Sequence, residues 1–298
     1  MAFAQIAGFL GLGLLLQRHA ALRRWLLPIC VQAVLWICLP ALALLRLPTL
    51  NLRPQLLLPV LLIWLCFGGA VLWSGLWPHN RATRVCLILT CGLGNTSFVG
   101  LPLLQALIGP PALPPALLLD QAGSFLITGT LGLALVAWGR GESLPPRRML
   151  YKLLSFPPFI AFAVGLLLAI CERPLSGLAA RIASGLAAGL APLALLSVGL
   201  QLQLRPQPEL RPLLLIGLSY KLLLAPLGVL LLGLSLKLPP LWLKVCVLEA
   251  AMGPMITSSL LVIAAGLRVE LATRLVGIGI PLSLLTVPLW HLLLQALF

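Results

Sequence analysis

The sequence predicts an all-α membrane protein of ten transmembrane helices, arranged as two inverted repeats of five helices, with broken, crossing fourth and ninth helices. Three observations predict this fold class. Of the 298 residues, 61% are hydrophobic and 9% are charged, too few to cover a soluble domain with polar groups. Many uncharged stretches reach the roughly 20 residues that cross a hydrocarbon core. Prolines and tryptophans also recur at one constant offset in corresponding stretches.

Ten segments are predicted to be spanning helices, because a backbone in lipid must satisfy its polar groups within the segment. The first is short, and the arginines that follow it can snorkel to the interface. No basic residue precedes it, which favours an uncleaved helix over a signal peptide. In order, the segments are 2–17, 28–46, 56–77, 84–108, 116–139, 153–171, 178–204, 211–235, 241–266 and 273–297.

Lys and Arg residues are concentrated in the connectors after the odd-numbered helices. Arg18, Arg23 and Arg24 follow the first helix, and the connector 140–152 after the fifth is also rich in Lys and Arg. This excess predicts that the odd connectors are cytoplasmic and that both termini lie on the outer side. The net charge of +14 is thus attributed to membrane orientation, since no basic face or aromatic platform for nucleic acid accompanies it.

An internal repeat is predicted from equal spacings. The first repeat covers 1–139, the connector 140–152, and the second repeat 153–298. Five helices is an odd number, so the two copies would lie inverted, as in many secondary transporters. The alternative is coincidence, because the chain holds 26 prolines. The pairs that are each 152 residues apart are Pro40 with Pro192, Pro102 with Pro254, and Trp138 with Trp290.

Two stretches in the fourth and ninth helices combine glycine, proline and small polar residues. Such residues are predicted to break the helices in mid-membrane, at Pro102 and Pro254. Half-helix N-termini at the breaks would favour an anionic group. The alternative is a pair of proline kinks packed by small residues. The candidate substrate-binding residues are Asn95, Thr96, Ser97, Pro102, Pro254, Thr257, Ser258 and Lys221.

Charged side chains within spans are costly and usually face a cavity or a partner. Lys221 is expected either to neutralise Glu249, to pair with a substrate carboxylate, or to bond to an exposed carbonyl. Glu249 is a candidate proton carrier or a structural partner of Lys221. Asp120, with Gln121 beside it, is a second candidate for ion or proton coupling; the alternative is a helix N-terminal acid at the membrane surface.

Several other functions are disfavoured by missing motifs. The seven cysteines form no CxxC pair and read as small buried hydrophobes. No catalytic triad, phosphate-cradling loop or metal-ligand spacing occurs. We therefore expect no enzyme activity, no cofactor and no metal site.

At these motifs the chain resembles the auxin efflux carrier family of membrane permeases. The resemblance implies ten helices in a sodium/bile-acid symporter-like fold, a crossover at Asn95, Pro102 and Pro254, elevator-like motion and a homodimer. Family substrates include auxin and, in bacterial members, malonate and other organic anions. The similar stretches, which occur in family order, are Leu39–Ala41, Gly94–Leu103, Asp120–Ser124, Ala191–Gly199, Lys221 with Pro226, Ala250–Pro254 and Leu285–Trp290.

Three departures from the family pattern refine these expectations. Ser97 stands where the family has glycine, and the short connector 140–152 resembles bacterial permeases, which implies a bacterial inner membrane. The third helix, 56–77, has no acid or base, so auxin is not the expected substrate.

The leading hypothesis is a permease for a small organic anion, a carboxylate, with a proton as candidate coupling ion and membrane lipid around it. The first alternative is a sodium-coupled symporter of an amphipathic acid. The second is a membrane receptor that binds without transport.

Overall fold

The computed structural model describes residues 2–50, 56–142, 147, 151, 154–202 and 208–298. Every regular element in these ranges is helical. Six of the helices are long and apolar enough to cross a membrane: Ala20–Thr49, Leu57–Gly75, Pro110–Arg140, Gly177–Gln201, Pro208–Ser235 and Val269–Leu297. Shorter apolar helices cover Gln5–Leu16, Thr96–Leu107 and Pro157–Ile170. The prediction of an all-α membrane protein is confirmed at this level, and the two-repeat organisation stays a prediction.

The chain divides into two compact units that alternate along the sequence. Unit 1 comprises Met1–Leu56, Ser97–Gln121 and Leu154–Leu202, and unit 2 comprises Leu57–Thr96, Ala122–Leu153 and Gln203–Phe298. The chain therefore passes from one unit to the other within the fourth and fifth predicted helices. The division into units does not test the repeat boundaries expected at 139 and 153, which stay a prediction.

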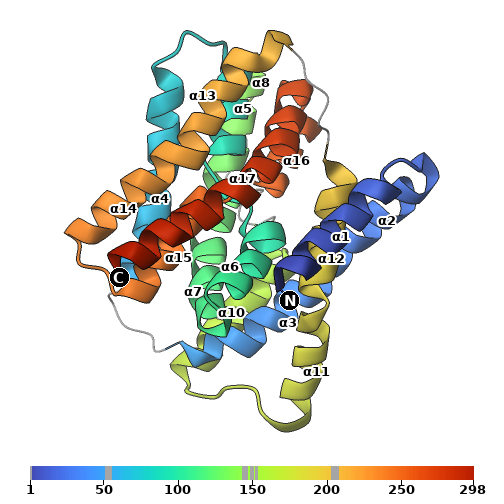
Figure 1. The fold of residues 1–298 in the computed structure, drawn as a ribbon, viewed down its shortest axis with the longest axis vertical. Coiled ribbons are helices and arrows are strands. Elements are labelled where there is room, and N and C mark those ends of the chain that lie inside the picture. Colours follow the sequence, from blue (N-terminus) through green and yellow to red (C-terminus); the bar gives the residue numbers. More distant parts are fainter. Residues whose placement is uncertain (1, 51–55, 143–146, 148–150, 152–153, 203–207) are drawn as a thin grey trace. The chain divides into compact units, whose positions relative to one another are not determined.

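Unit 1 is built from helices that contact one another in pairs. α1 packs along α12, and α3 contacts both α10 and α11 (Figure 1). Glycine permits the close approach of α1 and α12, because a Cβ on Gly13 would lie 2.5 Å from the Leu196 oxygen. The helices are α1 (Ala2–Leu16), α2 (Ala20–Ala33), α3 (Leu39–Arg46), α6 (Leu101–Leu107), α7 (Leu113–Leu118), α10 (Pro157–Ile170), α11 (Gly177–Ala188) and α12 (Leu190–Gln201).

One helix of unit 1 begins earlier than predicted. α2 starts at Ala20, so Arg23 and Arg24 lie inside a helix and not in a connector. Arginine is a good helix former, and its long side chain reaches the interface from a helical backbone. A π-helical segment, Val34–Cys38, joins α2 to α3 and ends just before Pro40.

Unit 2 contains two helices, α5 and α15, whose C-terminal halves are buried. α4 contacts α5, α14 and α15, while α17 contacts α13, α15 and α16. Asn80 caps α5 by accepting a hydrogen bond from the Thr83 amide, and Pro240 begins α15. The helices are α4 (Leu57–Gly75), α5 (Arg81–Cys91), α8 (Leu133–Arg140), α13 (Arg211–Ser219), α14 (Ala225–Ser235), α15 (Pro240–Ala251), α16 (Ile256–Ala264) and α17 (Val269–Leu297).

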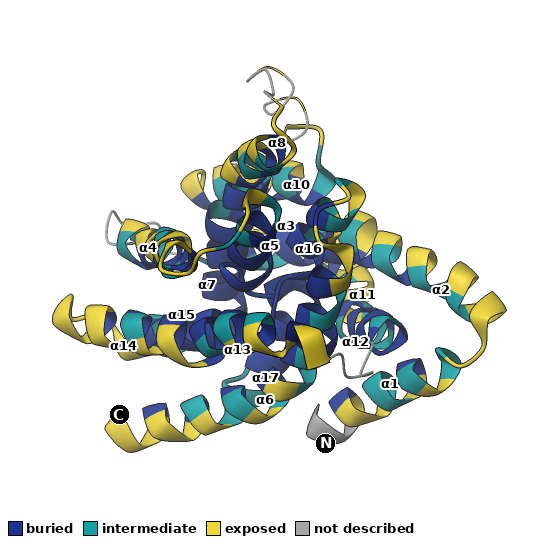
Figure 2. Ribbon diagram, turned by 90° about the horizontal axis from the view of Figure 1, so that it is seen from above, coloured by how far each residue is buried: buried dark blue, intermediate teal, exposed yellow. Residues whose placement is uncertain are grey.

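The burial pattern separates lipid-facing helices from core helices. Large apolar side chains such as Leu72 of α4 and Leu285 of α17 are exposed, which suits contact with lipid. Figure 2 shows exposed stripes along α1, α2, α14 and α17, whereas α5 is dark along much of its length. Every residue of α5 from Val85 to Cys91, and of α15 from Val245 to Ala251, is buried. These two buried stretches belong to the protein core, and both lead into the breaks described below.

Candidate functional site

Two core helices of unit 2 stop in the middle of predicted spans. α5 ends at Cys91, and the chain is not helical again until the π-helical segment Thr96–Gly100. α15 ends at Ala251, and α16 begins at Ile256. The two helix ends, at 91 and 251, and the two restarts, at 96 and 256, are each 160 residues apart.

The two breaks pair with each other. Gly94 and Pro254 form an isolated antiparallel bridge, and the Asn95 amide donates to the Gly253 carbonyl at 2.9 Å. Backbone groups freed inside a bilayer need such partners. Glycine is required here, because a Cβ on Gly94 would lie 2.6 Å from the carbonyl oxygen of Glu249.

The prediction that the fourth helix breaks at Pro102 is wrong. Pro102 lies in the first turn of α6, where proline fits because no backbone donor is needed. The break falls earlier, at Gly92–Asn95, and the residue opposite Pro254 is Gly94. The offset of 152 residues between Pro102 and Pro254 therefore does not relate the two breaks.

Polar side chains hold the paired breaks in place. The Thr96 hydroxyl donates to the Glu249 carboxylate, and the Ser258 hydroxyl donates to the Leu89 carbonyl at 2.7 Å. The first bond joins the segment after α5 to α15, and the second ties α16 to the end of α5. Thr257 is half-buried. The Asn95 side chain is 2% exposed, and its Nδ2 has no acceptor among the described residues. Asn95 thus offers a free donor at the break.

Lys221 lies beside the same breaks. Its side chain is 1% exposed, and its Nζ is 3.5 Å from the position that a Cβ on Gly94 would occupy. Lys221 belongs to a π-helical segment, Tyr220–Leu224, between α13 and α14. Such segments occur often at functional sites. The acidic group that interacts with it electrostatically is Glu249.

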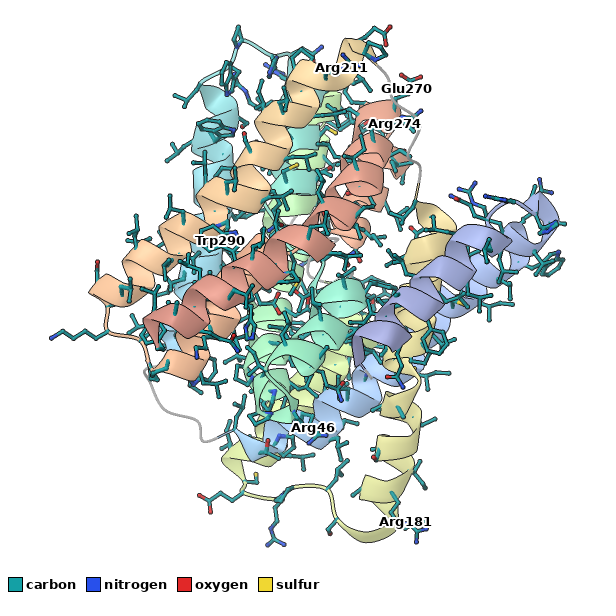
Figure 3. All side chains as sticks on the ribbon, viewed as in Figure 1. Arg46, Arg181, Arg211, Glu270, Arg274 and Trp290 are labelled. Atoms are coloured by element: carbon teal, nitrogen blue, oxygen red, sulfur yellow. The ribbon has the colours of Figure 1, made fainter. Side chains whose placement is uncertain are left out.

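A proline explains the local backbone around Lys221. Pro226 has no N–H to donate to the carbonyl four residues earlier, that of Leu222. The indole Nε1 of Trp290, in the C-terminal third of α17, donates to this carbonyl instead, at 3.0 Å (Figure 3). The Tyr220 hydroxyl donates to the Cys66 carbonyl, and its ring stacks on Trp73. The sequence analysis did not predict these contacts around Lys221, although Pro226 indicated that the Leu222 carbonyl would lack its helical donor.

A second polar cluster belongs to unit 1. Asp120 is fully buried, and its Oδ2 accepts hydrogen bonds from Ser97 Oγ and Gln121 Nε2, both at 2.8 Å. Asp120 Oδ1 and Gln121 Oε1 accept no hydrogen bond from any described residue. Asp120 is therefore an interior group, and the alternative of a surface acid at a helix N-terminus is wrong.

The predicted site residues thus fall into two sets. Unit 2 brings together the paired breaks with Lys221 and Glu249, and unit 1 brings Ser97, Asp120 and Gln121 together. Pro102 belongs to unit 1 but has no polar role in the Asp120 cluster.

Comparison with known proteins identifies the class of molecule. The family described as "Membrane transport protein" matches residues 33–291, a range that contains both breaks, Asp120 and Lys221. The chain is also 28% identical to an "uncharacterized transporter" of Methanothermobacter thermautotrophicus over 227 residues, which is 76% of this chain and 73% of that protein. The resemblance read from the sequence motifs is confirmed. The chain belongs to the membrane transport protein family, that of the auxin efflux carriers, and is a multi-pass membrane transporter and not an enzyme.

Proposed function

We propose that the chain is a permease that carries a small organic anion, a carboxylate, across a bacterial inner membrane. One observation carries the proposal: the ammonium group of Lys221 is buried next to the paired breaks of a transporter. A charge within a membrane span is costly, and it typically marks a substrate or ion path.

Three groups at the breaks suit a carboxylate. Lys221 provides a positive charge, and Asn95 provides a free amide donor. α16 begins at Ile256 with no side-chain cap, so its first backbone N–H groups add a positive partial field. Together they would replace the water around an incoming carboxylate.

Glu249 suggests how binding is coupled. Its carboxylate accepts from Thr96 and interacts electrostatically with Lys221. A proton on Glu249 would release Lys221 for a substrate carboxylate, so protonation of Glu249 would favour substrate binding and the two would move in the same direction. The Asp120 cluster, with two free oxygen acceptors, is the other candidate coupling site, for a proton or for sodium.

The helix inventory supports ten spans, and an elevator-like mechanism is proposed from the family resemblance. Two broken pairs, α5 with α6 and α15 with α16, and the short α1 and α10 add four spans to the six long helices. Ten spans place both termini on one side, which the distribution of Lys and Arg assigns to the outer side. Unit 1 holds the first two spans of each half together with Ser97–Gln121, and we propose that its spans form the scaffold through which two copies make a dimer.

Counterflow in proteoliposomes tests the proposal, with malonate, succinate and acetate as probes. Lys221→Met should lower affinity about ten- to hundred-fold, the worth of a charge-assisted hydrogen bond. Lys237→Met, which alters an exposed lysine of unit 2, should leave counterflow unchanged. Counterflow that survives in Lys221→Met removes Lys221 from the site. Uptake that requires a sodium gradient favours the symporter, and binding without counterflow favours the receptor.

A further inference from the structure

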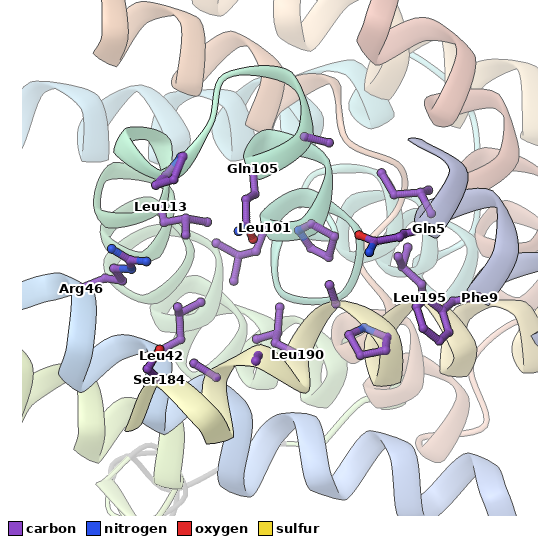
Figure 4. Close-up of a pocket in the computed structure, with 18 of the residues that line it drawn as sticks. Gln5, Phe9, Leu42, Arg46, Leu101, Gln105, Leu113, Ser184, Leu190 and Leu195 are labelled. Carbon is purple, nitrogen blue, oxygen red and sulfur yellow. The ribbon is translucent and has the colours of Figure 1, made fainter. Parts of the chain in front are cut away.

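Two buried charged residues, Asp120 and Lys221, lie in π-helical segments, Leu119–Phe125 and Tyr220–Leu224 respectively. A π-helical turn shifts the backbone hydrogen bonds by one residue, so that a carbonyl in or beside it can accept from another helix. The residues that line the cavity of about 620 Å³ in unit 1 include neither of the two (Figure 4). Packed protein therefore surrounds both side chains.

One helix, α4, contacts the segment that carries Asp120, although α4 itself has no acidic or basic residue. The indole Nε1 of Trp64 donates to the Ala122 carbonyl at 3.1 Å, two residues after Asp120. Glycine permits this approach, because a Cβ on Gly123 would lie 2.8 Å from Cγ2 of Ile63 in α4. These contacts lie within unit 2 and hold the backbone that follows Asp120.

The same helix contacts the segment that carries the buried lysine. The indole Nε1 of Trp73 donates to the Ile216 carbonyl at 2.9 Å, in the last turn of α13. The Tyr220 hydroxyl donates to the Cys66 carbonyl of α4. A Cβ on Gly69 would lie 2.6 Å from the Tyr220 hydroxyl oxygen, so this approach also requires glycine.

Two indoles thus hold the backbone on both sides of Lys221. Trp73 binds the carbonyl of Ile216, five residues before the lysine, and Trp290 binds the carbonyl of Leu222, the residue after it. An indole has a rigid ring with one N–H, so it fixes the place of the carbonyl that accepts from it. A displaced backbone would carry the ammonium group of Lys221 away from the paired breaks.

We infer that Trp73 is a positioning residue for Lys221, and that α4 is the common support of the two π-helical segments, through Trp73 for one and Trp64 for the other. The inference rests on the proposed binding of an anion by Lys221. It names a residue that sets the affinity for the anion without contact to it.

Counterflow of malonate with Trp73→Phe tests the inference. Phenylalanine keeps an aromatic ring and removes the N–H, so the half-saturating malonate concentration should rise about two- to ten-fold, the worth of one hydrogen bond. The control is Trp36→Phe, because Trp36 also lies in a π-helical segment, Val34–Cys38, but is 61% exposed. A reduced maximal rate at unchanged half-saturation would show a merely structural role and overturn the inference.

A double variant shows whether Trp73 acts through the lysine. In the Lys221→Met background, Trp73→Phe should change the half-saturating malonate concentration by less than about two-fold, since the group that it positions is gone. An equal effect in both backgrounds would refute the positioning role.

Hydrogen exchange of the backbone amides, measured on monodisperse protein, tests the support role without transport. Trp73→Phe should speed exchange in 216–224, and Trp64→Phe should speed it in 119–125. Trp36→Phe should change neither stretch. Unchanged exchange in both indole variants would rule out α4 as the support.

The two measurements separate the inference from the proposed function. If malonate shows no counterflow and Trp73→Phe still speeds exchange in 216–224, the permease proposal fails and the support role of α4 stands. If counterflow depends on Lys221 but Trp73→Phe changes neither half-saturation nor exchange, the inference alone fails.

Discussion

Replacing Gly94 by alanine tests the pairing of the two breaks. The added Cβ would lie 2.6 Å from the carbonyl oxygen of Glu249, closer than real Cβ contacts, and 3.5 Å from Nζ of Lys221. The oxygen belongs to the backbone of α15, so relief requires moving Gly94 away from Glu249, which disturbs its bridge to Pro254. Overpacking of this kind costs about 1–3 kcal/mol, and we expect Gly94→Ala to lower both thermal stability and transport.

The assay is the fraction of monodisperse protein that remains after heating, measured by fluorescence-detected size exclusion. Gly228→Ala is the matched control, because Gly228 lies in α14 with no atom within 4 Å of its would-be Cβ. Alanine in a helix interior is favoured over glycine by up to about 1 kcal/mol, so this variant should be neutral or slightly more stable. Equal melting behaviour of the two variants would refute the close pairing.

Two other outcomes follow from unit 1. Gly199→Ala places a Cβ 2.4 Å from the Leu10 oxygen, so it should push α1 from α12 and destabilise the protein by about 1–3 kcal/mol. The neutral control in the same heating assay is Gly8→Ala, whose added Cβ meets no atom within 4 Å. Cys171 is the one exposed cysteine of the seven and follows α10, the sixth proposed span, so the proposed orientation places it on the outer side. A membrane-impermeant maleimide should therefore label it in intact cells, and Cys171→Ser should abolish the label. Labelling only after lysis would reverse the proposed orientation.

The positions of the long helices were predictable, because lipid imposes one rule on each span. The third predicted segment, 56–77, matches α4 (Leu57–Gly75) closely. The second was wrong at its start, since α2 begins at Ala20, because the pattern of uncharged residues stops at an arginine whereas the helix does not. Charge marks where lipid ends and not where hydrogen bonding along the backbone ends.

The site was predictable in composition and not in geometry. Glycine, proline and small polar residues did mark the two breaks, but proline alone was a poor marker, because Pro102 fits a helix start. The hydrogen bond from Thr96 to Glu249 joins residues that are 153 positions apart, and no local pattern reports such a contact.

The bond between the Trp290 indole and the Leu222 carbonyl makes Pro226 and Trp290 interdependent. Without the indole, the buried Leu222 carbonyl would lose the donor that stands in for the missing N–H of Pro226. With a different residue in place of Pro226, the restored backbone amide would compete with the indole for the Leu222 carbonyl. The Trp290 N–H would then need another acceptor. In related chains, the residues aligned with Pro226 and Trp290 should therefore be replaced together. A relative that keeps both residues should also keep this backbone conformation beside its buried lysine.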